Sequence, residues 1–273
     1  MVHDTIVRVG VFDLHPFGLS VAAGIVVGYL VALGFALRAR LAARYLPGML
    51  VVVVLGALII ARLGFVAWRR GAAGAGAQGI LSLYGLNLPV GVIGGTLLLA
   101  VYTWARREPL WLWADALAPA GAIGLAIGML GLPSNGEGWG RPTAGPFSIG
   151  VDVTLLPQEF VNSRRFQPVF AYETALFAAL AILLVVLFER QRRLGRPPTG
   201  VVGLVFLLVT MLGYGALRPL TLDAADPALV LQTQILCAAV AAIACGLLVA
   251  RLWRARAGVE ITRQTERVRV GSV

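Results

Sequence analysis

The sequence contains no lysine and little charge of any kind. Charged residues make up only 13% of its 273 residues, whereas 59% are hydrophobic and the mean hydropathy is +0.85. This composition excludes an ordinary soluble domain. Every basic residue is arginine, and the net charge is +10. Because the arginines lie mostly in short loops between apolar runs, membrane orientation explains them better than nucleic-acid binding does.

Cysteine is also scarce. Cys237 and Cys245 lie in one apolar segment, where small buried hydrophobic side chains are expected. The pair predicts neither a disulfide nor a metal site, and we expect no cofactor. The first 15 residues are polar and precede an apolar run of full length, so we expect no cleavable signal peptide.

Seven apolar runs are each long enough to cross a bilayer, which takes about 20 residues. They are Phe17–Leu37, Leu46–Trp68, Leu86–Ala105, Trp111–Leu132, Val169–Phe188, Thr199–Leu217 and Ala228–Trp253. The sequence therefore predicts an all-α polytopic membrane protein with about seven transmembrane helices, which form one domain over residues 1–273.

Arginine is divided unevenly between the two sides of these runs. Most arginines follow the first, third, fifth and seventh runs: Arg38, Arg40, Arg44, Arg106, Arg107, Arg190, Arg192, Arg193, Arg196, Arg251, Arg254, Arg256, Arg263, Arg267 and Arg269. Because arginine-rich loops stay in the cytoplasm, we predict an outside N-terminus and a cytoplasmic C-terminus. Residues 133–168 are then an extracytoplasmic loop between the fourth and fifth helices. Residues 254–273 are a basic cytoplasmic tail attracted to anionic lipid.

The segment from Asn135 to Arg141 reads Asn-Gly-Glu-Gly-Trp-Gly-Arg and directly follows the fourth run. Glycine lets a backbone approach a ligand closely or adopt conformations closed to other residues. Polar groups concentrated at the end of a membrane span suggest a site at the interface. The alternative is a glycine-rich turn anchored in the interface by Trp139.

Three further charged residues are predicted at the same membrane surface. Arg62 lies inside the second run, Glu173 just inside the fifth, and Arg218 closes the sixth. Arginines there can bind a phosphate through paired hydrogen bonds, while carboxylates such as Glu137 balance charge or move protons. The arrangement suits an anionic phospholipid. Snorkelling of Arg62 and helix-end roles for Glu173 and Arg218 are the alternatives.

Other residues suit helix packing. Asp115, near the start of the fourth run, is expected to interact with the helix dipole there. Gln234 is expected to hydrogen-bond a neighbouring helix, and Trp113 is expected to be an interfacial anchor. Glycines at small-residue spacing predict close helix contacts at Gly91, Gly94, Gly95, Gly121, Gly124 and Gly128.

Together these motifs resemble the prolipoprotein diacylglyceryl transferase family over nearly the whole chain. Residues 135–141 match the latter half of its signature, and residues 114–119 resemble its Ala-Asp-x-x-Ala-Pro. Residues 61–65, 167–173, 214–218 and 233–236 resemble four further family motifs. The resemblance implies a seven-span protein of the bacterial cytoplasmic (inner) membrane. It also implies transfer of diacylglyceryl from phosphatidylglycerol to the thiol of a lipobox cysteine.

The resemblance further implies roles for single residues. Those that would bind the phospholipid are Arg218, Arg141, Arg62, Asn135, Gly140, Tyr172 and Gln234. Glu137 or Glu173 would take the thiol proton, with His15 as a further candidate base. The implied partners are phosphatidylglycerol or another anionic phospholipid and the signal peptide of a prolipoprotein, and no nucleic acid.

The sequence departs from the family pattern at several polar positions. Pro89 stands at the family histidine, Met129 at its first signature arginine, Leu132 at an asparagine and Phe17 at a tyrosine. Two more polar family positions fall nearest Leu222 and Ala225. A non-catalytic paralogue that binds phospholipid or lipoprotein is therefore an alternative. A small-solute transporter is less favoured, because no inverted repeat is evident.

Overall fold

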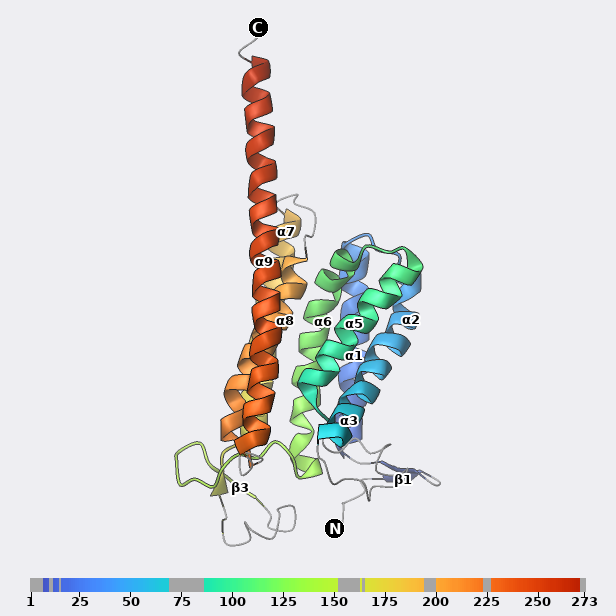
Figure 1. Ribbon diagram of the computed structural model, residues 1–273. Coiled ribbons are helices and arrows are strands. Elements are labelled where there is room, and N and C mark those ends of the chain that lie inside the picture. The colour runs from blue at the N-terminus through green and yellow to red at the C-terminus, as the bar shows by residue number, and fades with distance from the viewer. Residues whose placement is uncertain are drawn as a thin grey trace.

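Within the part of the chain that the structure describes, seven helical segments are long and apolar enough to cross a membrane, which confirms the predicted all-α polytopic fold. The computed structural model describes residues 7–9, 12–14, 16–68, 86–151, 163, 165–193, 200–222 and 227–270. The spans form one bundle, with the N-terminus at its lower end in Figure 1 and the C-terminus beyond its upper end. We call the lower end, where α1 begins, the site end, and the upper end the arginine end.

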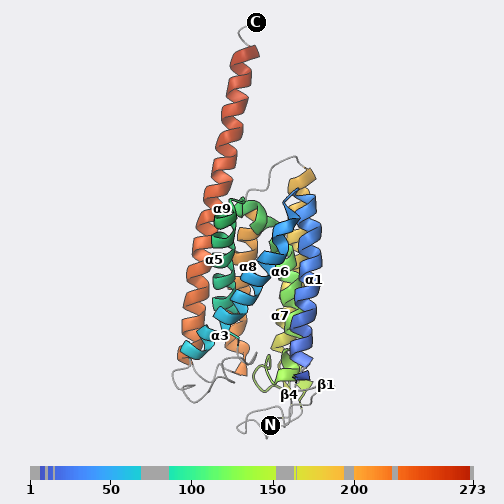
Figure 2. The ribbon, with the colours of Figure 1, turned by 90° about the vertical axis from the view of Figure 1, so that its right-hand side faces the viewer.

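The elements follow the predicted runs closely. The first span is α1 (Pro16–Arg38), and the second combines η1 (Ala43–Tyr45), α2 (Leu46–Met49), the π-helix η2 (Leu50–Leu55) and α3 (Gly56–Trp68). The others are α5 (Leu88–Arg106), α6 (Leu110–Leu130) with η4 (Leu132–Asn135), α7 (Val169–Arg193), α8 (Val201–Leu217) with η7 (Arg218–Leu220), and α9 (Pro227–Val270). The strands β1 (Val7–Val9) and β2 (Phe12–Leu14) pair antiparallel, as do β3 (Ile149–Gly150) and β4 (Arg165–Phe166). Helix α9 runs well past the predicted end at Trp253 and projects beyond the bundle (Figures 1 and 2).

Helix α6 packs against α1, α7 and α8, and small residues allow this contact. A Cβ added to Gly124 of α6 would lie 3.1 Å from the Gly24 carbonyl oxygen of α1. A Cβ added to Gly91 of α5 would lie 2.9 Å from that of Ala61 in α3. The predicted close contacts are therefore confirmed there, because only glycine allows backbones to come so near. The prediction is wrong for Gly128, which has nothing within 4 Å of an added Cβ.

Large apolar side chains cover the outside of the bundle. Leu97, Ile182 and Ile243 are 61%, 68% and 64% exposed on α5, α7 and α9. Apolar surface of this extent suits hydrocarbon, in which the backbone groups of helices are satisfied internally. The protein is thus a multi-pass membrane protein.

Asp115 connects two spans at the arginine end. Its carboxylate, fully buried on α6, accepts hydrogen bonds from the Gly200 and Gly203 N–H groups at 2.8 and 2.9 Å. It therefore caps the N-terminus of α8 rather than that of its own helix. Gly200 has a φ of +83° and leaves no room for a Cβ against the Trp111 ring.

The anchor role predicted for Trp113 is wrong. This side chain is fully buried, and its indole nitrogen donates to the Glu108 carboxylate at 3.1 Å. It packs in an apolar cluster built from α1, α2, α5 and α6.

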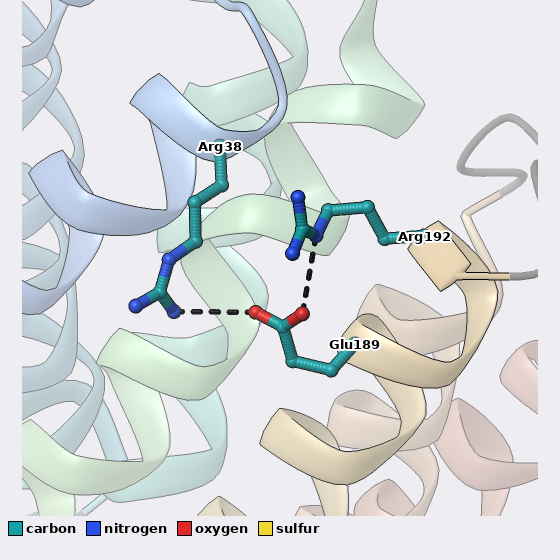
Figure 3. A network of polar contacts seen from close by, with 3 residues as sticks. All are labelled: Arg38, Glu189 and Arg192. Carbon is teal, nitrogen blue, oxygen red and sulfur yellow. Dashed lines mark hydrogen bonds and ion pairs between the residues drawn. The ribbon is translucent and has the colours of Figure 1, made fainter.

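A second polar connection at the arginine end joins α1 to α7. Figure 3 shows Glu189 of α7 between two arginines, accepting from Arg38 at 3.3 Å and from Arg192 at 3.1 Å. Phe35 and Phe188 meet edge to face nearby, with ring centroids 4.8 Å apart. The buried rings contribute more to this contact than the half-exposed ion pairs, which are worth about 0–1 kcal/mol.

Candidate functional site

The segment from Asn135 to Arg141 forms a tight turn at the site end. After α6, the Gly136 N–H donates to the Pro133 carbonyl at 3.1 Å and the Glu137 N–H to the Leu132 carbonyl at 3.0 Å. Gly136 and Gly138 have φ values of +73° and +75°. Other residues rarely adopt this left-handed conformation, which explains two of the three glycines.

The following residues lie between two other parts of the chain. On one side, the Gly140 N–H donates to the Gln167 carbonyl at 2.7 Å, just before α7. On the other side, the Arg141 N–H donates to the Leu220 carbonyl at 3.0 Å, just after α8. The Leu222 N–H returns a bond to the Trp139 carbonyl at 3.1 Å. The segment from Asn135 to Arg141, which we call the signature segment, thus holds the ends of α6, α7 and α8 together.

Gly140 leaves no room for a larger residue in this arrangement. An added Cβ would lie 2.7 Å from the Leu220 carbonyl oxygen and 2.8 Å from the Gln167 Cβ. Gln167 accepts from Gly140 and donates to the Arg141 carbonyl at 3.2 Å, so two residues oppose one, as in a β-bulge. Bulges redirect side chains near functional sites. The Arg141 side chain is exposed here.

The Trp139 side chain is packed inside the site end. The side chain is only 7% exposed and meets the Phe170 ring edge to face, at 5.4 Å between centroids. The buried indole Nε1 has no hydrogen-bond partner among the described residues. Trp139 is therefore an internal packing residue of the site, not an anchor that reaches outward into the interface.

Three charged residues from different parts of the chain come together beside this turn. Glu173 of α7 is only 4% exposed, and the charges of Arg218 and Glu137 act on its carboxylate. Arg218 follows α8 directly, and Glu137 belongs to the turn after α6. A buried carboxylate requires such a counter-charge, since removing an unpaired charge from water is costly. The buried Glu173 thus has a cationic and an anionic neighbour at the site end.

Tyr214 is a site residue to which the sequence assigned no role. The Arg218 Nη1 donates to its hydroxyl oxygen at 3.4 Å, and the guanidinium lies 5.5 Å from its ring centroid. The signal was the spacing of four residues, which places both side chains on one face of a helix. Tyr214 therefore orients the arginine.

Gln234 bonds across helices as predicted. Its Nε2 donates to the Gly215 carbonyl at 3.3 Å, which ties α9 to α8 next to the charge cluster. Cys237, one turn further along α9, would lie 3.1 Å from a Cβ added to Gly215. It is a buried thiol packed between helices.

Arg62 lies inside the bundle rather than at its rim. It is 8% exposed, and its guanidinium is 5.0 Å from the Phe65 ring centroid. The neighbouring Ala61 carbonyl accepts from the Asn87 N–H at 3.2 Å, and Asn87 caps α5 through its side chain. Arg62 is thus level with the start of α5 at the site end.

The remaining predicted site residues are less closely defined. Tyr172 is half-buried in the first turn of α7, and its N–H donates to the Pro168 carbonyl. His15 and the side chain of Asn135 lie outside the described residues. Their predicted roles stay predictions. Within the described ranges, no group of three or more His, Cys, Asp or Glu residues could hold a metal ion.

The substituted family positions are filled with apolar packing. Phe17 and Met129 are 6% and 9% exposed, and Met129 lies in the apolar cluster of α6, α7 and α8. Leu132 packs against the same cluster, and Pro89 is fully buried in the first turn of α5. These four side chains therefore contribute apolar packing that excludes water, and they contribute no charge.

The sequence matches known proteins over most of its length. A family model described as "Prolipoprotein diacylglyceryl transferase" matches residues 4–253. The chain belongs to the prolipoprotein diacylglyceryl transferase family. The match includes the first six spans, the seventh span up to Trp253 and every charged residue of the cluster.

Curated relatives named phosphatidylglycerol–prolipoprotein diacylglyceryl transferase match most of this chain. That of Synechococcus elongatus is 29% identical over 212 residues, covering 77% of this chain and 73% of its own length. That of Thermosynechococcus vestitus is 27% identical over 218 residues, covering 79% and 80%. That of Synechococcus sp. strain CC9902 is 30% identical over 217 residues, covering 78% of each.

Proposed function

We propose that this family member transfers diacylglyceryl from phosphatidylglycerol to the cysteine thiol of a prolipoprotein lipobox. The observation that carries the proposal is the cluster of Glu173, Arg218 and Glu137 beside the signature segment. The names of the relatives specify the same donor and acceptor. The bilayer supplies the lipid, and the acceptor is recognised at its signal peptide.

The reaction requires removal of the thiol proton, formation of the carbon–sulfur bond and stabilisation of the leaving phosphate, and the members of this cluster serve different steps. The thiol proton passes to a carboxylate of the Glu137 and Glu173 pair, and the sulfur forms a bond to the glyceryl carbon. The bond from that carbon to the phosphate oxygen breaks, and its electron pair leaves with glycerol phosphate, which then takes the proton. Arg218, oriented by Tyr214, stabilises the charge on the leaving phosphate.

Other residues support the phospholipid around this centre. Arg62 and Arg141 supply further positive charge, while Gly140 and Gln234 hold the backbone and helix that carry Arg218. Asn135, Tyr172 and His15 belong to the proposal as predicted from the sequence. Asn135 and Tyr172 are assigned to lipid binding, and His15 is a second candidate base.

The proposed location is the bacterial inner membrane, with the site end outside. Arg38, Arg106 and Arg192 lie in the last turns of α1, α5 and α7, and Arg254 lies at the end of the seventh span. The positive-inside rule assigns this arginine end to the cytoplasm. The N-terminus and the loop at 133–168 are then extracytoplasmic, and the tail at 254–273 is cytoplasmic. This orientation presents the cluster to the outer leaflet.

A mass-shift assay tests the proposal directly. Purified full-length protein in phosphatidylglycerol micelles is mixed with a lipobox peptide, and the peptide mass is measured. We expect a diacylglyceryl gain that disappears with Arg218→Ala and with a Cys→Ser peptide. The matched control is Arg192→Ala, which removes an arginine from the other end of the bundle and leaves the gain intact.

The packing of Pro89 and Met129 favours one alternative, a non-catalytic paralogue that binds phospholipid. Both positions bury apolar side chains where the family resemblance predicts polar ones. Native mass spectrometry on the same folded preparation separates the two functions. Bound phosphatidylglycerol without any peptide mass gain would overturn the transferase and support the paralogue.

A further inference from the structure

Two hydrogen-bond donors beside the charge cluster have no acceptor among the described residues. One is the indole Nε1 of Trp139, whose side chain is only 7% exposed. The other is the buried hydroxyl of Thr174, which follows Glu173 directly in α7. We propose that these two groups bind an ester carbonyl oxygen of the phospholipid and so position its glyceryl carbon. That this lipid is the donor of the reaction rests on the proposed function.

Phe170 brings the two donors together. Its ring meets the Trp139 ring edge to face, with the centroids 5.4 Å apart. Thr174 lies one helical turn after Phe170, and side chains four residues apart are neighbours on one face of a helix. Helical side chains lean towards the N-terminus of their helix, so the Thr174 side chain leans towards Phe170. Both side chains therefore lie beside the same ring, at the site end of α7.

The Thr174 hydroxyl differs from those of three other helical threonines. Thr96, Thr103 and Thr233 each donate to the carbonyl four residues earlier, at 2.8, 2.8 and 2.9 Å. Such a bond satisfies the hydroxyl within its own helix. The Thr174 hydroxyl makes no such bond to the Phe170 carbonyl. A buried donor without an acceptor costs free energy, so a ligand that supplies an oxygen gains affinity there.

The backbone directs the Trp139 side chain away from the Gln167 side chain. Gly140 forms an antiparallel bridge with Thr221, so the signature segment is extended here. Successive residues of an extended segment point to opposite sides, and the Gln167 Cβ lies on the Gly140 side, 2.8 Å from an added Cβ. Because the Trp139 N–H makes no hydrogen bond with the described residues, the indole can turn towards a lipid without breaking one.

The chemistry of the two donors favours an ester carbonyl over a phosphate. An indole N–H and a hydroxyl are neutral, and their common neighbour Phe170 is apolar. A phosphate is costly to bury beside neutral groups, whereas an ester carbonyl carries no charge and accepts two hydrogen bonds. In a phospholipid, an ester lies on the carbon next to the one that bears the phosphate. With the phosphate at Arg218, this ester is the nearest neutral acceptor of the lipid.

The level of the donors in the membrane also matches an ester. Helix α7 has 25 residues, whereas the hydrocarbon core requires about 20. Its first residues therefore lie among the headgroups. Phe170 and Thr174, which belong to the first two turns, lie at the edge of the hydrocarbon. The ester groups of phospholipids lie at the same boundary.

Ester and ether lipids test the site in the full-length protein. Dialkyl phosphatidylglycerol keeps the headgroup and both chains but lacks the carbonyl oxygens. The peptide mass gain is measured with each lipid for the wild type, Trp139→Phe and Thr174→Val. With the ester lipid, we expect each variant to be slower by on the order of 5-fold, the effect of one neutral hydrogen bond. With the ether lipid, the wild type should be as slow as the variants.

The matched control is Thr210→Val, which removes another hydroxyl that lacks an acceptor within the described ranges, about two turns before Arg218 in α8. Its rates should equal those of the wild type with both lipids. Equal losses of Trp139→Phe with ester and ether lipids would overturn the proposal, and a raised KM for the peptide would then assign the donors to a peptide carbonyl. Unchanged rates in both site variants would also overturn it and leave a bound water as the acceptor.

A binding measurement separates this site from the proposed function. Native mass spectrometry of the folded protein with equal amounts of the ester and ether lipids gives the ratio in which they bind. An ester preference that Trp139→Phe abolishes supports the site, and in a preparation without peptide transfer it does so while counting against the transferase. Transfer at the normal rate with no difference between the two lipids overturns the site alone.

Discussion

The guanidinium of Arg218 is hydrogen-bonded to the hydroxyl of Tyr214, one helical turn before it, at 3.4 Å. The same guanidinium lies 5.5 Å from the Tyr214 ring centroid. The tyrosine therefore holds the arginine in two ways, through its hydroxyl and through its ring. Since Arg218 also acts on the buried Glu173, the orientation of one side chain governs the charge balance of the cluster.

Removal of the Tyr214 hydroxyl should reduce transfer only moderately. A hydrogen bond to a charged group contributes about 1.5–3 kcal/mol, and this one is long at 3.4 Å, so Tyr214→Phe should slow transfer by about 10-fold. Arg218→Lys should slow it by more than about 100-fold, because a lysine cannot bind phosphate through paired bonds. Initial rates of peptide mass gain compare the two variants. Equal losses in both would show that the hydroxyl itself meets the substrate.

Gly140→Ala should damage the site, whereas Gly128→Ala should be harmless. The first change places a Cβ within 2.8 Å of three neighbours, and overpacking of this kind costs about 1–3 kcal/mol. The second fills open space on the same chain. Thermal unfolding in detergent and peptide transfer are measured for both. An active and stable Gly140→Ala protein would contradict the close contact with Leu220.

Asp115→Ala should destabilise the fold by about 2–5 kcal/mol, because it leaves two buried N–H groups of α8 without an acceptor. The control at the same end of the bundle is Glu189→Gln. It breaks ion pairs of Arg38 and Arg192 whose side chains are 53% and 54% exposed, and should cost less than about 1 kcal/mol. Midpoints of thermal unfolding give the order. The reverse order would refute the capping role of Asp115.

Trp139→Phe should leave stability nearly unchanged, since the indole N–H finds no acceptor among the described residues and the ring contact with Phe170 is retained. Trp139→Ala should cost about 3–5 kcal/mol through the lost packing. Unfolding midpoints test both. If Trp139→Phe unfolds normally but no longer binds phosphatidylglycerol, the N–H donates to the lipid instead.

The spans were predictable because hydropathy alone determines which segments enter hydrocarbon. Packing partners were less accessible to the sequence. Asp115 suggested a cap for its own helix, yet it binds Gly200, 85 residues away. A single sequence shows which residues are polar but not which distant backbone group they meet. The anchor role predicted for Trp113 was wrong for a related reason, because the end of a span can be buried against other helices.

The candidate site was likewise predictable only in part. That Glu137, Glu173 and Arg218 gather at one end could be inferred from their positions at run ends. The double pairing of the signature segment with Gln167 and Leu220 could not, because backbone hydrogen bonds leave no mark on residue identity. Gly140 is the residue whose type reflects this pairing, but the sequence does not show which neighbours exclude a larger side chain there.

The hydrogen bonds described above fall into two sets, and this division has a mechanical consequence. Those of Asp115, Glu189, Gln234 and the signature segment join α1, α6, α7, α8 and α9. Those of Asn87 and of the Tyr102 hydroxyl, which donates to the Tyr45 carbonyl at 3.3 Å, join α5 to the second span. The two bodies meet where α5 packs on α6 and α9 and where the start of the second span packs on α1, and the apolar cluster around Trp113 lies at this boundary. Because apolar side chains slide over one another without breaking hydrogen bonds, we expect the second span and α5 to shift as one unit against the other five helices.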